Sequence, residues 1–335
     1  MKYIIAIDGG GTKTKAYIGN EKGEVLGASE GGPSNYHSVG ITGVRSSLNS
    51  VVQALCSAVN INKDNIDVVS LGLAGMDRAV DRRIIKALLS DIGIEGSCIF
   101  NNDAMTALIG AHGIKEGVVT ICGTGSICLG IDRNGRIART GGWGHVIGDE
   151  GSGYDIGIKC LKAVMKSHDK RGGNTLLKDK VLKYFNISSP EDLVKQIYEG
   201  SSKDSIAGLA ALTAEAAFEA DVTAKNILEK AVLDLVEMTE AVINELYSED
   251  DRILLSTAGG IFSNIDFVAE RFSLELRKRF KLIDIYEPKF DGAVGAMIIA
   301  WNEMGISYNV NELKYQVKDV NLYGYGDFNK NQTGV

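Results

Sequence analysis

The pattern of apolar and polar positions predicts an alternation of short strands and amphipathic helices in the first third of the chain. Short apolar runs bounded by glycine and polar residues are typical of buried strands, and apolar residues spaced three or four apart are typical of helices. On this basis, strands are expected at 4–8 (IIAID), 15–19, from 24, 66–73 and 98–100, and helices at 41–60, 80–89 and 104–111.

The same pattern then starts again. The apolar run 118–122 (VVTIC) is followed by glycines, a strand at 127–131 and a turn at 132–135, and Ile7 and Gly23 correspond to Ile121 and Gly135. This repeat is far longer than that of a solenoid protein, so it predicts two domains of one topology, over 1–115 and 116–335.

The second half has a helical insertion before its last strands. We expect helices over 207–220 and 222–247 with Asp221 as a cap, then a strand at 253–258, a helix at 265–280, a strand at 282–286 and a small-residue helix at 292–304. The last residues, 324–335, are polar and are expected to be loosely held.

Composition narrows the function classes. The chain of 335 residues has a net charge of −7, which argues against a nucleic-acid coat or a protein that binds anionic membranes. Its 5 cysteines include no Cys-x-x-Cys pair, and no segment is apolar enough to be a signal peptide or a membrane span, so we expect a cytoplasmic protein. The 40 glycines against 3 prolines indicate backbone that turns tightly or approaches a ligand closely.

Several common motifs are missing from the sequence. There is no Walker A loop, no Gly-x-Gly-x-x-Gly fingerprint, no His-Glu-x-x-His and no Gly-x-Ser-x-Gly. Nucleotide binding, if present, must therefore use another arrangement of glycines.

Two glycine-rich turns are candidates for binding phosphate. The first, Asp8–Thr14 (DGGGTKT), follows a buried strand, and its backbone N–H groups and the Thr12 hydroxyl suit phosphate oxygens. Asp8 at the strand end suits a hydrated Mg²⁺, although it could equally be an acceptor in an ordinary turn. The second turn, 123–126 (GTGS), has the equivalent place in the second half.

Two further segments suit an adenine ring and a sugar. The strand end at Gly259 and Gly260 leaves bare backbone on which a planar group can lie, although a plain strand-to-helix turn would have the same pattern. The segment 141–153 (GGWGHVIGDEGSG) offers Trp143 to the C–H face of a pyranose and carboxylates to its hydroxyl groups, although a packed Trp in a flexible loop would look the same. His145 in this loop is as compatible with a structural imidazole as with a ligand.

These segments, in this order, resemble the phosphate and adenosine loops of the actin/hexokinase/Hsp70 superfamily over residues 4–301. The string 141–153 resembles the N-acetylglucosamine kinase branch of the BadF/BadG/BcrA/BcrD-type ATPase family. The resemblance implies an α/β fold with two ribonuclease-H-like (actin/hexokinase-type) domains flanking a ligand cleft, and ATP with Mg²⁺ as cofactors. It implies an amino-sugar kinase acting on the C6 hydroxyl of N-acetylglucosamine, with N-acetylmuramate and glucosamine as alternatives.

The resemblance also assigns residues. Asp103, in Asn101–Ala104, would be the catalytic base, and Asp8 would be the metal ligand. The sugar would contact Asn35, Asp103, Ser126, Gly142, Trp143, Gly144 and Asp149. ATP would contact Gly10, Gly11, Thr12, Lys13, Thr124, Gly125, Gly259, Gly260 and Ser263. The mammalian-type enzymes have a Trp soon after the Asn, where this chain has Tyr36 and His37.

Two other function classes stay open. The broad family includes activator ATPases with an iron–sulfur cluster between subunits, which draws attention to Cys122 and Cys128, although these are expected to be inert thiols. A sugar sensor or filament protein that binds ATP without turnover is the third class, and Asp103 argues against it. A homodimer is left open, and neither nucleic acid nor membrane is expected as a partner.

Overall fold

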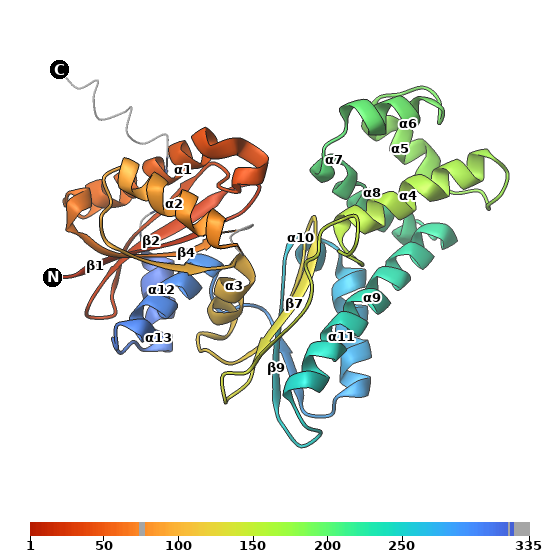
Figure 1. Ribbon diagram of the computed structural model, residues 1–335. Coiled ribbons are helices and arrows are strands. Elements are labelled where there is room, and N and C mark those ends of the chain that lie inside the picture. Colours follow the sequence, from red (N-terminus) through yellow and green to blue (C-terminus); the bar gives the residue numbers. More distant parts are fainter. Residues whose placement is uncertain (74–77, 321, 325–335) are drawn as a thin grey trace. The chain divides into compact units, whose positions relative to one another are not determined.

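The computed structural model describes residues 1–73, 78–320 and 322–324, so the segment expected to be loose lies outside the described residues from 325 on. The chain divides into two compact units (Figure 1), which are Met1–Glu116 together with Pro288–Val335, and Gly117–Glu287.

The first unit is built on a mixed sheet with the strand order β11-β3-β2-β1-β4-β5. Strands β1, β2 and β3 are antiparallel neighbours, and β4 and β5 continue the sheet in parallel with β1. Its elements are β1 (Tyr3–Gly9), β2 (Thr14–Asn20), β3 (Val25–Gly31), α1 (Tyr36–Ala58), η1 (Lys63–Asn65), β4 (Ile66–Leu73), α2 (Ala79–Asp91), β5 (Ser97–Asn101), α3 (Asp103–His112), α12 (Gly292–Glu303), α13 (Val310–Asp319) and β11 (Leu322–Gly324).

Helices on both faces explain why β1 is almost wholly apolar. Ile4, Ile5, Ala6 and Ile7 all have no exposed surface, because α1 packs against β2 and β3 on one face and α12 packs against β1 and β4 on the other. A strand covered on both faces is expected to be a continuous apolar run rather than an alternating one.

The second unit repeats this topology. Its sheet has the order β10-β9-β6-β7-β8, which matches the order β5-β4-β1-β2-β3 of the first unit. Its elements are β6 (Gly117–Cys122), β7 (Ser126–Ile131), β8 (Ile137–Gly141), α4 (Gly153–His168), α5 (Leu177–Phe185), α6 (Asp192–Lys195), η2 (Gln196–Gly200), α7 (Lys203–Ala207), α8 (Leu209–Phe218), α9 (Val222–Leu246), β9 (Ile253–Ala258), α10 (Gly260–Asn264), α11 (Asp266–Arg279) and β10 (Ile283–Tyr286). The duplicated α/β fold predicted from the sequence is confirmed.

The placement of the C-terminal segment differs from the prediction. The sequence pattern predicts one domain for everything after residue 115, whereas the structure groups the chain from Pro288 onward with the first unit. The reason is α12, whose residues from Ala293 to Trp301 are buried against α3, β1 and β4. The helix expected over 207–220 also differs, because Gly208 separates α7 from α8.

Other local predictions agree with the structure. The Asp221 carboxylate accepts a hydrogen bond from the Ala224 N–H at 2.8 Å and caps α9, as expected. Among the described residues, no helix has the length and apolar character needed to cross a membrane.

Candidate functional site

The first glycine-rich turn joins β1 to β2 in the first unit. The Gly10 N–H donates to the Lys13 carbonyl at 3.1 Å, and the Gly10 carbonyl accepts the N–H groups of Ser34 and Asn35 at 3.1 and 3.2 Å. The structure therefore places Asn35 next to this turn, and its assignment as a sugar contact stays a prediction. A Cβ on Gly10 or Gly11 would meet no atom within 4 Å, so this turn leaves open space where a ligand can approach.

Neighbouring contacts explain the other residues of this turn. Gly9 has no room for a side chain, because a Cβ would lie 1.9 Å from the Ser34 Oγ. Thr14 donates to the Gly32 carbonyl at 2.6 Å, which ties β2 to the end of β3. The exposed Lys13 forms an ion pair with Glu30 at 3.3 Å.

Three carboxylates gather at the carboxyl end of β1. Burial, together with the negative charges of Asp103 and Asp291, raises the pKa of Asp8 to about 7. The Thr106 hydroxyl donates to Asp8 Oδ1 at 3.3 Å and opposes this rise. A partly buried carboxylate among negative charges is a place where a cation is favoured.

Asp291 was not singled out from the sequence as a site residue. Its carboxylate caps α12 by accepting the Val294 N–H at 3.0 Å. It also accepts a hydrogen bond from the Tyr17 hydroxyl at 3.0 Å and pairs with Lys15 at 2.8 Å. The sequence signal was an aspartate before a run of small helical residues, which indicates a helix cap but not these partners.

Asp103 is exposed at the first position of α3, and the helix cap is the residue before it. The Asn102 side chain accepts the Met105 N–H at 2.8 Å, so Asn102 is the N-cap. Asn102 and not Asp103 therefore caps α3, and the Asp103 Oδ1 accepts the N–H of the next residue, Ala104, at 3.0 Å. Its assignment as catalytic base stays a prediction.

Close backbone packing sets the positions of Asp8 and Asp103. A Cβ on Gly295 of α12 would lie 1.9 Å from the Thr106 carbonyl of α3, and a Cβ on Gly292 would lie 2.7 Å from the Asp8 carboxyl carbon. Helices α3 and α12 can approach this closely because glycine has no side chain.

The second glycine-rich turn is anchored to helix α4 in the second unit. The Gly123 carbonyl accepts the Gly153 N–H at 2.8 Å, and the Thr124 carbonyl accepts the Tyr154 N–H at 3.3 Å. The Thr124 hydroxyl donates to Asp204 at 2.8 Å, a partner from α7 that the sequence did not indicate.

Asp149 lies against this turn. A Cβ on Gly125 would be 3.0 Å from Asp149 Oδ2. Burial raises the pKa of Asp149, and backbone N–H groups of Ser126 and Gly144 that bond to its carboxylate oppose the rise. The buried Ser126 hydroxyl donates to the Glu150 carbonyl at 2.8 Å, so it holds the loop, and a sugar contact for it stays a prediction.

Trp143 is 64% exposed, as a residue that stacks on a ligand would be. The Arg139 guanidinium lies 4.8 Å from its ring centre and donates to the Gly142 carbonyl at 2.8 Å. Gly142 and Gly144 have φ angles of +68° and +90°, which glycine adopts readily. Arg139 was not predicted, because a cation on an aromatic face leaves no local sequence pattern.

The proposed adenine segment adjoins the second turn. Gly259 has a φ of +96°, and a Cβ there would lie 2.3 Å from the Cys122 carbonyl, just before Gly123. The Ser263 hydroxyl donates to the Gly259 carbonyl at 3.2 Å, and the Asn264 amide donates to the Gly260 carbonyl at 2.8 Å.

The remaining candidates, two cysteines and one histidine, pack against other residues of the second unit. Cys122 and Cys128 are buried free thiols, and burial raises the pKa of both, that of Cys128 to about 12. The His145 ring packs edge-on against Tyr154 with ring centres 4.9 Å apart.

Comparison with known proteins agrees with this fold and these loops. A repeated five-strand order with a glycine–threonine turn in each repeat defines the actin/hexokinase class. A crystal structure described as a candidate N-acetylglucosamine kinase from Chromobacterium violaceum has a TM-score of 0.74 and 25% identity, and covers 89% of this chain and 99% of its own. The chain belongs to the BadF/BadG/BcrA/BcrD ATPase family, whose sequence profile matches residues 5–300.

Two curated relatives are similar over nearly their whole length. An N-acetylmuramic acid/N-acetylglucosamine kinase from Clostridium acetobutylicum is 40% identical, over 90% of this chain and 99% of its own. An N-acetyl-D-glucosamine kinase from Dictyostelium discoideum is 32% identical, over 89% of this chain and 98% of its own.

Proposed function

We propose that this protein is an ATP-dependent amino-sugar kinase, which transfers the γ-phosphoryl group of ATP to a sugar hydroxyl. The observation that carries the proposal is the contact of Asp149 with Gly125, where a Cβ would lie 3.0 Å from the carboxylate. An acceptor for sugar hydroxyls and a turn suited to phosphate thus occupy one place in the second unit. The two full-length relatives named as amino-sugar kinases support this reading.

We assign ATP to the two glycine–threonine turns and to the Gly259 segment. Backbone N–H groups in such turns suit phosphate oxygens, and Thr12 and Thr124 add hydroxyl groups. Phosphoryl transfer needs mainly positioning and neutralisation of charge, so these groups and one base suffice.

Mg²⁺ fits the carboxylate cluster of the first unit. Asp8 is partly buried, and desolvation and the charges of Asp103 and Asp291 raise its pKa, so a cation would relieve this repulsion. Asp8 would hold the ion with water as the other ligands, since Mg²⁺ needs only one or two protein carboxylates. When bound, the ion supplies neutralisation of phosphate charge.

Asp103 is proposed as the general base. It is exposed at the start of α3, and the cap of that helix is Asn102, so its carboxylate is not needed for capping. It can accept the hydrogen bond of an attacking sugar hydroxyl, align it and take its proton late in the transfer.

For the sugar, we propose N-acetylglucosamine phosphorylated at C6, with Trp143, Asp149 and Asn35 as contacts. N-acetylmuramate is the first alternative, because the Clostridium relative is named for both sugars, and glucosamine is the second. The cytoplasm, where ATP is supplied, is the proposed compartment.

An ATP-coupled screen of free sugars and amino sugars tests the proposal. We expect ADP release that depends on N-acetylglucosamine and is lost in Asp103→Asn. ADP release that no sugar stimulates would contradict it. The structure does not support the activator ATPase alternative. Cys122 and Cys128 lie in the core of the second unit, whereas a cluster between subunits needs cysteines at the surface.

A further inference from the structure

The segment that carries Asp149 ends in a backbone turn tied to helix α4. Asp149 and Gly151 both have left-handed backbone, with φ angles of +60° and +75°. The Gly151 N–H donates to Asp155 Oδ2 at 2.9 Å, and the Asp155 N–H donates to the Ser152 Oγ at 3.2 Å. These two hydrogen bonds join the loop to the first turn of α4.

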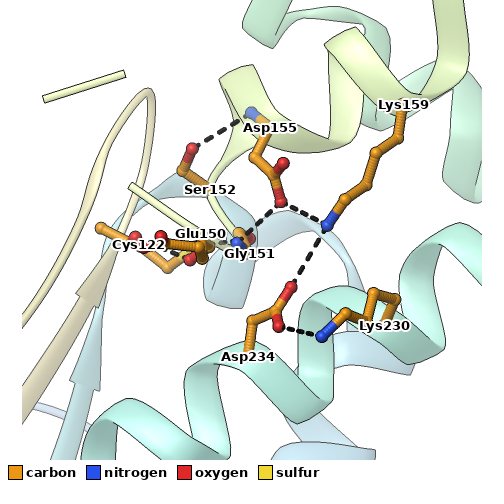
Figure 2. A network of polar contacts seen from close by, with 9 residues as sticks. Cys122, Glu150, Gly151, Ser152, Asp155, Lys159, Lys230 and Asp234 are labelled. Carbon is orange, nitrogen blue, oxygen red and sulfur yellow. Dashed lines mark hydrogen bonds and ion pairs between the residues drawn. The ribbon is translucent and has the colours of Figure 1, made fainter. Parts of the chain in front are cut away.

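The Asp155 carboxylate continues into a chain of alternating charges. Its Oδ2 also accepts a hydrogen bond from Lys159 at 2.6 Å, and Lys159 reaches Asp234 of α9 at 3.2 Å. Asp234 in turn pairs with Lys230 at 2.5 Å. Figure 2 shows this path from the Gly151 peptide through α4 to α9.

The chain is more buried than a surface ion pair. The side chains of Asp155, Lys159 and Asp234 are 24%, 28% and 9% exposed. Exposed pairs contribute little, whereas loss of one partner in a partly buried pair leaves the other charge without compensation. A helix cap alone would not require Lys159 to span two helices.

The loop is also held from its other side. At Gly151 a Cβ would lie 2.7 Å from the Ala231 carbonyl, so the loop backbone rests directly on α9. The Cys122 thiol donates to the Gly151 carbonyl at 3.3 Å (Figure 2), and Ser126 holds Glu150. The Asp155 contact is thus the charged member of a set that fixes the peptides directly after Asp149.

We propose that Asp155 is a positioning residue for sugar binding and that Lys159 and Asp234 hold its carboxylate in place. The inference rests on the proposed function, because it takes Asp149 as a sugar contact. A fixed peptide at Gly151 sets the direction of the Asp149 carboxylate before the sugar arrives, so ordering of the loop does not weaken binding.

Two substitutions at Asp155 separate positioning from folding. Asp155→Ala removes the acceptor of the Gly151 N–H, and we expect the sugar KM and Kd to rise roughly 10-fold or more, as loss of a charged hydrogen bond implies. The ATP KM and kcat should stay within about threefold, because the ATP turns keep their own anchors. Asp155→Asn keeps an acceptor oxygen, and we expect it to restore most of the sugar affinity.

Lys159→Met tests the rest of the chain of charges. It keeps the length of the side chain and should raise the sugar KM in the same direction as Asp155→Ala. The double variant should be no worse than the more affected single variant, because both changes interrupt one path. Lys225→Met is the matched control, since Lys225 and Glu229 form an exposed pair at the same spacing on α9, 3.9 Å apart.

Hydrogen exchange of segment 148–153 and calorimetric sugar Kd complete the test. We expect faster exchange in Asp155→Ala and Lys159→Met, and wild-type exchange in Lys225→Met. A sugar Kd within twofold of wild type in Asp155→Ala would overturn the proposal, even if exchange is faster, because Asp155 would then be a helix cap only. Binding without phosphorylation in the wild type would contradict the kinase assignment alone, and the Kd would still decide the role of Asp155.

Discussion

Gly295→Ala should displace the carboxylates of Asp8 and Asp103, although Gly295 itself is assigned to no ligand. An added Cβ would lie 1.9 Å from the Thr106 carbonyl and 2.7 Å from the Gly110 nitrogen, both of them backbone atoms. Real Cβ atoms essentially never come within 3.0 Å of such atoms, so α3 and α12 must separate by about 1 Å. Such overpacking typically costs about 1–3 kcal/mol.

The sign of the stability change in Gly295→Ala separates the clash from the helix preference of alanine. In a helix, alanine is favoured over glycine by about 1 kcal/mol, so without the clash this change would stabilise the protein. We expect a net loss of stability in urea unfolding instead. Because Thr106 bonds to Asp8 and lies one turn after Asp103, a shift of about 1 Å should also lower kcat by roughly 100-fold.

Gly200→Ala is the control for this experiment. Gly200 ends a helical segment, and its Cβ would make only an ordinary contact at 3.7 Å. We expect unchanged or slightly greater stability and unchanged kcat. If Gly295→Ala behaved like Gly200→Ala, the close approach of α3 and α12 would not be what positions Asp8 and Asp103.

Three further substitutions test individual assignments. Trp143→Ala should raise the sugar KM roughly 10- to 100-fold, because the sugar loses one stacked ring. The affinity for a non-hydrolysable ATP analogue should be unchanged. Loss of ATP affinity with unchanged sugar affinity would refute the role of Trp143 in sugar binding. Asp103→Asn should lower kcat at least about 100-fold with a near-normal sugar Kd. Asn102→Ala should instead lower the stability of the protein by about 1 kcal/mol, because it removes the cap of α3. A kcat within tenfold of wild type in Asp103→Asn would show that Asp103 is not the general base. Asp8→Asn, in EDTA, should be more stable than wild type at pH 8 by a few kcal/mol, and this gain should shrink as pH falls through about 7 towards 4. The variant is more stable because the folded protein disfavours the ionised Asp8 carboxylate at any pH above its raised pKa, and asparagine carries no charge. Equal stabilities of variant and wild type at pH 8 would contradict the raised pKa.

The repeating parts of the fold were predictable from sequence because they depend on local patterns. The strands 66–73 and 253–258 have the expected bounds, since each is an apolar run flanked by polar or glycine residues. Asp221 was predictable as a cap because capping uses a residue and its immediate neighbours.

Features that depend on contacts between distant segments were not predictable. The return of α12 to the first unit depends on packing against α3, far away in the sequence. Asp291, Asp204 and Arg139 gain their places in the same way, through Lys15, Thr124 and Trp143. Charged residues of these types are common on protein surfaces, so the sequence gives no reason to select them.

The candidate site likewise has contiguous segments that the sequence reveals and contacts between distant residues that it does not. The glycine-rich turns and the Trp143–Asp149 segment could be found because they are contiguous, and their assignment to ATP and sugar came from the resemblance to a family. Asp155 follows that segment in the first turn of α4, and the sequence does not single it out, because its partners Lys159 and Asp234 meet only when α4 packs on α9.

Transfer of the γ-phosphoryl group of ATP to an amino sugar is the reaction that we propose for this protein. The most direct measurement incubates the wild type and Asp103→Asn with N-acetylglucosamine, Mg²⁺ and ATP radiolabelled in the γ-phosphate, and separates the products. We expect label in N-acetylglucosamine phosphate, at C6, with the wild type and not with Asp103→Asn. Label released only as inorganic phosphate, with no labelled sugar from N-acetylglucosamine, N-acetylmuramate or glucosamine, would contradict it.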